Sequence, residues 1–381
     1  MAVENSCPVV LLCIPVSDFA GVARHLMDIA SNGGIPGFDV KFVVPSGELV
    51  SRLREVGASV VEAEFGVEAG FTRSFRTLNA LIDELRPSIV HTHLAYADVV
   101  AAAVVNSRKA RRVIQKNLVV PKLVSTEHGI AVDDLVYHGT VAKQKTMETV
   151  HRVRHWFTDG AIAVSQFNAV QMKRKWGVAN VEVIPNGVDL DTVIMKVQAA
   201  RVKADTGELR IVSMARLAPE KKIDVLIDAF ALVVKERPHA RLEIAGKGEL
   251  REQLEKQVNC LGISTKVCFS GFNDPFVVMG RNDVLVQLSI AENNSYTLLE
   301  AKAAGLHVIA TAMGGNPEQL EDSEMVPALT ATNRAKVVEA TAEKIFAIAD
   351  GTIPLSEGFS WSTTKKMTQS IAHKYKKVLN G

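Results

Sequence analysis

The stretch LRIVSMARLAPEKKIDVLIDAFALVVKERPHARLEIAGKG, residues Leu209–Gly248, decides the fold class. It opens on an apolar run typical of a β-strand and continues, over Lys222–Glu236, in an amphipathic pattern that predicts a helix. A second apolar run, RLEIA, follows. A strand, a helix and another strand in this order predict a parallel βαβ unit, because parallel strands need a long crossover connection.

The same alternation runs through the rest of the chain. Strands are expected at PVVLLCIPV, beginning near Pro8, and then at FDVKFVVP, ASVVEAEF, SIVHTH, KLVSTEH, GAIAVS, VEVIPNG, KVCFSGF, DVLVQLS and HVIATAMGG. Helices are expected from about Gly21, over Glu48–Val56, Leu78–Leu85 and Ala95–Val105, around Lys143–Phe157, and over Leu250–Leu261 and Tyr296–Ala304. The polar stretch Asp191–Gly207 shows no such pattern and is interpreted as a connection.

The length of the chain favours two domains. It has 381 residues, 47% of them hydrophobic, whereas single cores stop growing near roughly 250–300 residues. We expect an α/β protein with two doubly wound Rossmann-like domains, residues 1–190 and 191–360, facing across a cleft at the carboxyl ends of their strands. The amphipathic ending, residues 361–381, predicts a helix that packs back on the first domain.

Composition narrows the class of protein. A net charge of +2 with 23% charged residues gives no reason to expect nucleic acid as a partner. The four cysteines form no CxxC pair and mostly lie in apolar runs, which indicates buried reduced thiols. The first apolar run has no basic flank and is too short to span a bilayer. These features predict a cytoplasmic protein.

Basic residues gather in SRKARRVIQK, residues 107–116, and again in KRKW, residues 173–176. A solvated helix end explains such a run. Peripheral contact with an anionic membrane, at its inner face, is the alternative, and it would suit a phosphorylated or lipid-linked substrate.

The segment AENNSYTLLEAKAAG carries the strongest chemical signal. Glu292 and Glu300 lie eight residues apart, the first on a loop and the second in a helix that begins near Tyr296. A helix N-terminus presents unpaired N–H groups, so the amides around Asn294, Ser295 and Tyr296 are expected to bind phosphate oxygens. Glu292 would accept hydrogen bonds from sugar hydroxyls, and Glu300 from a ribose diol. An N-capping Asn with two solvated helix glutamates is the alternative interpretation.

Two cations precede that segment in the same half of the chain. Arg216 and Lys221 lie on the loop between a strand and a helix. A planar guanidinium and an ammonium facing one site suit a diphosphate leaving group. A plain surface loop whose helix starts at Glu220 is the alternative.

These motifs resemble those of the family 4 glycosyltransferases, whose signatures are a strand ending in RLxxxK and an acid pair spaced E-x7-E. The resemblance extends over nearly the whole chain, through VIPNGVD, GKG, FSGF, MGGNPE and the terminal FSW. It implies the two-domain GT-B architecture and retention at the anomeric carbon. It also implies that Arg216 and Lys221 hold the donor diphosphate, that Glu292 binds the donor sugar and that Glu300 binds the nucleotide ribose.

The first half departs from the family in the loop after its first strand, where the usual pair of glycines is replaced by Ala20 and Gly21. Gly21 would still allow close approach of a phosphate, while Ala20 narrows the backbone conformations. The resemblance places His128 against the donor sugar as a catalytic residue. Of His91 and His93 we expect one to be a structural hydrogen-bonding residue and the other to line the acceptor site.

Two motifs are set aside. GKGELR lacks the third glycine of a dinucleotide fingerprint, which disfavours NAD. DLD, at Asp189–Asp191, resembles the metal-binding DxD of other glycosyltransferases but continues PNGVD into the connection between domains. No metal and no cofactor are therefore expected.

The combined expectation is a retaining, metal-independent transferase. The donor would be a nucleotide diphosphate sugar, UDP-sugar rather than GDP-sugar, and the acceptor a saccharide, a lipid-linked glycan or a small molecule in glycan or cell-envelope biosynthesis. Two alternatives stay open: a non-catalytic nucleotide-sugar-binding subunit, suggested by Ala20, and a sugar-nucleotide epimerase of the same architecture.

Overall fold

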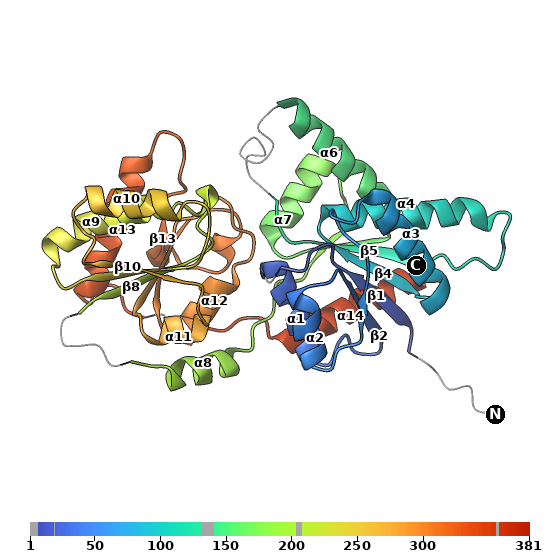
Figure 1. Ribbon diagram of the computed structural model, residues 1–381, viewed down its shortest axis with the longest axis horizontal. Helices are drawn as coiled ribbons and strands as arrows, with labels where there is room; N and C mark the ends of the chain where they lie inside the picture. The colour runs from blue at the N-terminus through green and yellow to red at the C-terminus, as the bar shows by residue number, and fades with distance from the viewer. Residues whose placement is uncertain (1–6, 19, 131–140, 203–207, 356–357) are drawn as a thin grey trace. The chain divides into compact units, whose positions relative to one another are not determined.

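The computed structural model describes residues 7–18, 20–130, 141–202, 208–355 and 358–381, with the backbone alone for 141–146. The chain forms two compact units, Met1–Gly187 with Ser362–Gly381, and Val188–Trp361. Each unit is a parallel sheet with helices on both faces (Figure 1). The predicted fold class, two doubly wound Rossmann-like domains, is confirmed.

The first unit contains a seven-stranded sheet in the order β3-β2-β1-β4-β5-β6-β7. Its strands are β1 Val9–Cys13, β2 Asp39–Val44, β3 Val60–Glu62, β4 Ile89–His93, β5 Lys122–Glu127, β6 Gly160–Ala163 and β7 Val181–Val183. Its helices are α1 Gly21–Ser31, α2 Glu48–Glu55, α3 Phe71–Leu85, α4 Ala95–Arg112, α6 Val141–Trp156, α7 Gln166–Gln171, the π-helix η1 Met172–Trp176 and α14 Thr364–Asn380. Side chains alternate between the faces along β1, so Leu12 packs toward α1 and α14 while Leu11 packs toward α3 and α4.

The second unit contains a six-stranded sheet in the order β10-β9-β8-β11-β12-β13. Its strands are β8 Arg210–Met214, β9 Arg241–Ala245, β10 Val267–Gly271, β11 Val284–Gln287, β12 His307–Thr311 and β13 Met325–Val326. Its helices are α8 Leu190–Ala199, α9 Ile223–Glu236, α10 Arg251–Cys260, α11 Pro275–Gly280, α12 Tyr296–Ala303 and α13 Arg334–Ala349, with 3-10 turns η2 Pro219–Lys221, η3 Asn316–Glu318 and η4 Asp322–Glu324.

Both sheets reverse their strand order near the middle, between β1 and β4 and between β8 and β11. Loops that leave neighbouring strands at such a switch point diverge to opposite faces and open a crevice at the carboxyl edge. The fold therefore selects the loops after β1, β4, β8 and β11 as the places for a site.

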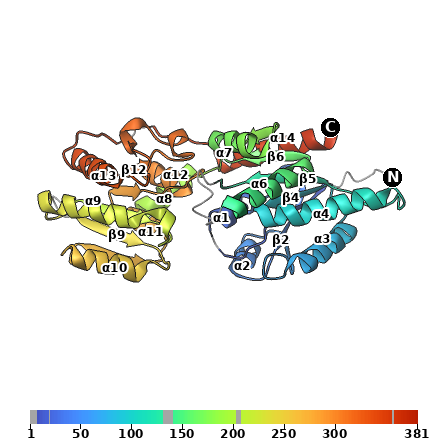
Figure 2. The same ribbon diagram turned by 90° about the horizontal axis from the view of Figure 1, so that it is seen from above.

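The C-terminal helix α14 belongs to the first unit, where it runs beside the strands of the sheet in both views (Figures 1 and 2). Met367, Ile371 and Tyr375 lie on its buried stripe and join the core of that unit. Its apolar stripe therefore has the partner surface that the sequence pattern demands.

Several local expectations were wrong. The stretch Asp191–Gly207 is not an unpatterned connection, because α8 occupies most of its described part and packs Val193 and Val197 into the second unit; residues 203–207 lie outside the described ranges. Helix α3 begins at Phe71, earlier than Leu78. Sequence patterns missed α7, η1, α11, α13 and β13.

The predicted burial of the cysteines was wrong for three of the four, because Cys7, Cys260 and Cys268 are exposed and only Cys13 is buried. All four are free thiols, as expected. In the chain as far as it is described, no helix combines the length and apolar character needed to cross a bilayer.

Candidate functional site

The second unit joins the two motif loops at the carboxyl edge of its sheet. Strand β8 leads through Arg216 into η2, and its parallel neighbour β11 leads through Glu292 into α12. Lys221, at the end of η2, donates from Nζ to Glu292 Oε1 at 2.5 Å. A backbone bond from Ile290 N to Glu220 O, 2.9 Å, ties the same loops together. Residues 71 positions apart thus form one charged pair, mostly shielded from solvent.

Glycine in the MGG motif is required by the position of Glu292. Gly314 has φ +61°, and a Cβ there would lie 1.7 Å from the Glu292 carbonyl oxygen. Gly315 N donates to that same oxygen at 3.1 Å. The loop after β12 therefore fixes the Glu292 backbone at a distance that no larger residue permits.

At the start of α12, Ser295 is a capping residue. Its Oγ accepts from Leu298 N at 3.4 Å, and its own amide donates to Gln319 Oε1 at 3.1 Å. The Ser295 amide is thus engaged within the protein, and a phosphate cradle at this helix would rely on the amides of the first helical turn, from Tyr296 on. Asn294 is buried beside the cap, and Glu300 is buried in the second turn.

Arg216 differs from Lys221 in its surroundings. Its side chain is 71% exposed, and Nη2 donates to Glu220 Oε1 at 2.5 Å. The structure therefore brings Lys221 and Glu292 together, whereas Arg216 pairs within its own loop.

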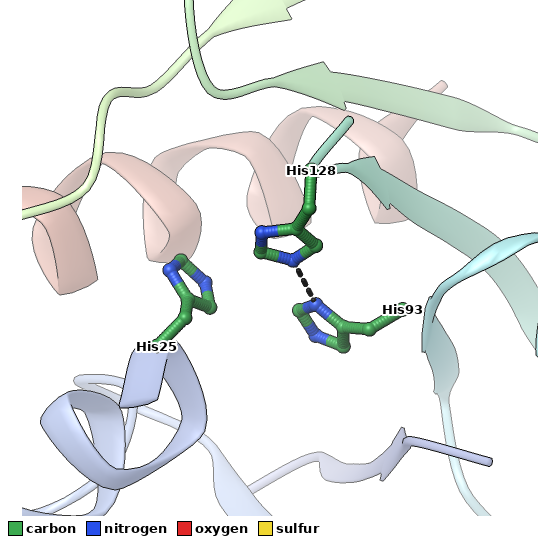
Figure 3. Close-up of side chains that lie close together, drawn as sticks. All are labelled: His25, His93 and His128. Atoms are coloured by element: carbon green, nitrogen blue, oxygen red, sulfur yellow. Dashed lines mark hydrogen bonds between the residues drawn. The ribbon is translucent and has the colours of Figure 1, made fainter. Parts of the chain in front are cut away.

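In the first unit, His128 lies just after β5 and joins a group of histidines (Figure 3). His128 Nε2 lies 2.8 Å from His93 Nδ1, at the end of β4. His91 contacts the Tyr375 hydroxyl through Nδ1 at 2.6 Å and the Thr126 hydroxyl through Nε2 at 2.7 Å. Both nitrogens of His91 therefore serve the packing of β4, β5 and α14, as expected for a structural residue.

Sequence reasoning missed His25, which α1 brings to the same group. Its ring centroid lies 4.8 Å from that of His128 and 5.5 Å from that of His93, and its Nδ1 lies 3.1 Å from Asn186 Oδ1. The available signal was its position one helical turn after Gly21, on the buried stripe of the helix that follows β1.

Burial dominates the electrostatics of this group. It lowers the pKa of His25 to about 4 and the pKa of His91 to about 3, because a charged imidazole loses its hydration there. Burial, followed by the neighbouring imidazoles, also holds the pKa values of His93 and His128 well below their usual range. All four rings are therefore neutral at pH 7.

A buried ionic group lies next to His128 and was also missed. Arg154, on α6, contacts Asp98 on α4 and Glu127 on β5, and the Thr92 hydroxyl donates to Asp98. One guanidinium lies between two carboxyl groups, and burial raises the pKa of Glu127 to about 8, which favours its protonated form at pH 7. This group fixes the backbone that carries His128, since Glu127 directly precedes it.

The remaining motif residues have local roles. Ala20 caps α1 in an extended conformation, φ −132°, so it introduces no strain, and a Cβ at Gly21 would meet nothing within 4 Å among the described residues. Asp189, of DLD, caps α8 by accepting from Thr192 N at 3.2 Å and from the Thr192 hydroxyl at 2.7 Å.

The basic run 107–116 is not uniformly solvated. Arg108 is fully buried, where it donates to Val119 O at 2.7 Å and contacts Asp83. In KRKW, Trp176 is buried and stacks on His151 with a centroid distance of 4.3 Å. Val113 and Ile114, beyond α4, are exposed.

Two family models match the chain, and they meet close to the boundary between its two units. A family model described as Glycosyltransferase Family 4 matches residues 19–192, and one described as Glycosyl transferases group 1 matches residues 196–350.

Among curated relatives, a Bacillus subtilis protein named as the glycosyltransferase EpsD is 28% identical over 66% of this chain and 65% of its own length. The alpha-monoglucosyldiacylglycerol synthase of Streptococcus pneumoniae is 31% identical over 35% of this chain and 32% of its own. The matches thus span less than two thirds of either relative.

Among solved structures, Anabaena HepE in complex with UDP-glucose superposes with a TM-score of 0.70 at 19% identity, covering 98% of this chain and 97% of that one.

Proposed function

Because the chain belongs to the family 4, group 1 glycosyltransferases, we propose that it transfers a sugar from a nucleotide diphosphate donor, UDP-sugar rather than GDP-sugar, with retention at the anomeric carbon. The acceptor would be a saccharide, a lipid-linked glycan or a small molecule in glycan or cell-envelope biosynthesis. The chain is an enzyme of the glycosyltransferase class; donor, acceptor and stereochemistry are the proposal.

The contact between Lys221 and Glu292 carries this proposal. An ammonium has three N–H donors, and Lys221 donates one of them to Glu292. The same ammonium can therefore bind a diphosphate oxygen while it orients the carboxylate. Glu292 would then accept hydrogen bonds from hydroxyls of the transferred sugar. Arg216, exposed on the same loop, would complete the diphosphate site when a donor displaces Glu220 from its guanidinium.

Charge stabilisation is the proposed source of catalysis. Arg216, Lys221 and the first-turn amides of α12 would stabilise the negative charge that develops on the leaving diphosphate. His128 is proposed as a catalytic residue that contacts the donor sugar, and its neutral ring suits hydrogen bonding rather than charge. A donor phosphate oxygen would take the acceptor proton. Glu300 would bind the ribose, so no carboxylate pair of glycosidase type remains for a covalent intermediate.

The UDP preference is supported by HepE, which is structurally similar and binds UDP-glucose. A lipid acceptor is supported by the similarity to the alpha-monoglucosyldiacylglycerol synthase. If the membrane serves as the source of acceptor, exposed Val113 and Ile114 within the basic run 107–116 would form the contact.

The test is a thermal-shift panel of UDP-, GDP- and ADP-sugars, followed by nucleotide release with the best donor, with and without candidate acceptors. Release that requires an acceptor, with a product of retained configuration, supports the proposal. An altered nucleotide sugar formed without acceptor would identify an epimerase. Donor binding without any turnover, across the acceptor panel, would identify a binding subunit.

A further inference from the structure

Three imidazoles from separate elements converge on one point in the first unit (Figure 3). His25 comes from α1, His93 from the end of β4 and His128 from the segment after β5. One ring nitrogen of each lies within 4.8 Å of the other two. The strands involved, β1, β4 and β5, are adjacent in the sheet, so the rigid part of the unit positions all three side chains.

The hydrogen bonds orient these rings as ligands. Asn186 presents its Oδ1 to His25 Nδ1 at 3.1 Å, and since an amide oxygen only accepts, Nδ1 carries the proton and Nε2 carries a lone pair. That Nε2 is buried and has no hydrogen-bond partner within the described residues. An oxygen acceptor that fixes the tautomer in this way is the usual partner of a metal-binding histidine.

Packing alone does not explain the group. Only His93 and His128 satisfy one another, at 2.8 Å, while His25 Nε2 and His93 Nε2 stay buried without a partner in the part of the chain that is described. Each buried nitrogen that is left without a partner destabilises the fold. One of the two nitrogens in the His93–His128 hydrogen bond carries a proton. An ion bound through both nitrogens therefore requires this proton to move to the other nitrogen of its ring or to leave.

We propose that His25, His93 and His128 together bind one divalent transition-metal ion of the zinc class, and that the bound ion inhibits sugar transfer. Neutral imidazoles select zinc, cobalt, nickel or copper rather than magnesium or calcium. Zn–N bonds of ~2.0–2.1 Å separate tetrahedral ligand atoms by about 3.3 Å, so His93 and His128 would move slightly apart and His25 slightly inward. Three protein ligands leave the fourth position to solvent.

The inhibitory half of the proposal rests on the proposed function, because it assumes that His128 contacts the donor sugar. A coordinated His128 would no longer offer that nitrogen to the sugar. The binding half rests on geometry alone and is tested without turnover.

Binding is measured by equilibrium dialysis with Zn²⁺ and by the visible absorption of Co²⁺, which reports tetrahedral coordination. The wild type should bind one ion per chain with a Kd of about 1 µM or tighter. His25→Asn, which keeps a donor for Asn186, should weaken binding at least ~100-fold, and Asn186→Ala by roughly 10–100-fold. His373→Asn removes an exposed histidine of α14 and is the matched control. Unchanged affinity in folded His25→Asn, or no tetrahedral Co²⁺ spectrum in the wild type, would overturn the site.

Inhibition is measured as the ratio of transfer rates with and without Zn²⁺, for each variant against its own metal-free rate. Wild type and His373→Asn should lose at least ~10-fold in rate at saturating Zn²⁺ and recover with EDTA, whereas His25→Asn should resist. Equal inhibition of His25→Asn would refute the inhibitory half. If no donor supports transfer but the ion binds, the proposed function fails and the metal site stands.

Discussion

The pH dependence of stability tests the burial of the histidines, and His25 gives the most direct test. Its pKa is lowered by burial to about 4, against roughly 6.5 in an unfolded chain. Between these values the unfolded state binds a proton that the folded state does not, so the contribution of His25 to stability is fully present above about pH 6.5 and is lost as the pH falls toward 4.

The magnitude follows from the width of that window. A proton that is bound in the unfolded state but not in the folded state changes the free energy of unfolding by about 1.4 kcal/mol per pH unit. Over the interval from pH 6.5 to pH 5, His25 therefore accounts for about 2 kcal/mol. In His25→Asn this term is absent. The other shifted groups, including His91 and Glu127, are common to both proteins, and burial is the first cause of their shifts. The difference between variant and wild type therefore reports mainly on His25, with a smaller contribution from its charge interactions with His91, His93 and His128.

The assay compares thermal unfolding of wild type and His25→Asn at pH 6.5 and pH 5. The variant is expected to lose some packing at pH 6.5 but to gain about 2 kcal/mol relative to wild type at pH 5, or roughly 4–8 °C in Tm. His373→Asn should follow the wild type. If the wild type and His25→Asn shift in parallel to within about 1 °C, His25 is protonated in the folded protein and the cluster is not dry.

Three further predictions concern the donor site. Activity should persist in excess EDTA, because side-chain cations stabilise the leaving group; loss that magnesium or manganese restores would contradict this. Arg216→Ala and Lys221→Ala should each raise the activation free energy of transfer by about 1.5–3 kcal/mol without unfolding the protein, and the effect should be larger at the shielded Lys221. Full activity in both folded variants would refute the diphosphate assignment. Glu300→Gln should weaken nucleoside diphosphate affinity in calorimetry, whereas Glu292→Gln should lower turnover and discrimination between epimeric donors; the opposite result reverses their roles.

The sequence was sufficient for the fold because its signal is local. Apolar runs of strand length between amphipathic stretches leave few arrangements other than parallel βαβ units. Motif spacing likewise predicted that Lys221 and Glu292 face one site, since both follow strands of one sheet. The sheet order that makes β8 and β11 neighbours is the additional fact that turns this expectation into a contact.

The first-unit site could be predicted only in part, because its members are not close in sequence. His25 reads as one polar residue on an amphipathic helix, and its role depends on how α1 packs against β4 and β5. Arg154 and Arg108 read as surface cations, because a sequence does not show which carboxylates will surround them. Burial of a charge is a property of tertiary packing, so periodicity gives no sign of it.

The VIPNGVD motif shows how a recognisable sequence signature can be structural. Asn186 holds the His25 ring, and Asp189 caps α8. Between them, a Cβ at Gly187 would lie 2.5 Å from Thr364 Cα at the start of α14, so only glycine allows this approach. Since the chain leaves the first unit after Gly187 and returns at Ser362, the motif anchors both crossings beside the histidines. Its residues therefore hold the backbone at both crossings, and Asn186 contacts the histidine group through His25.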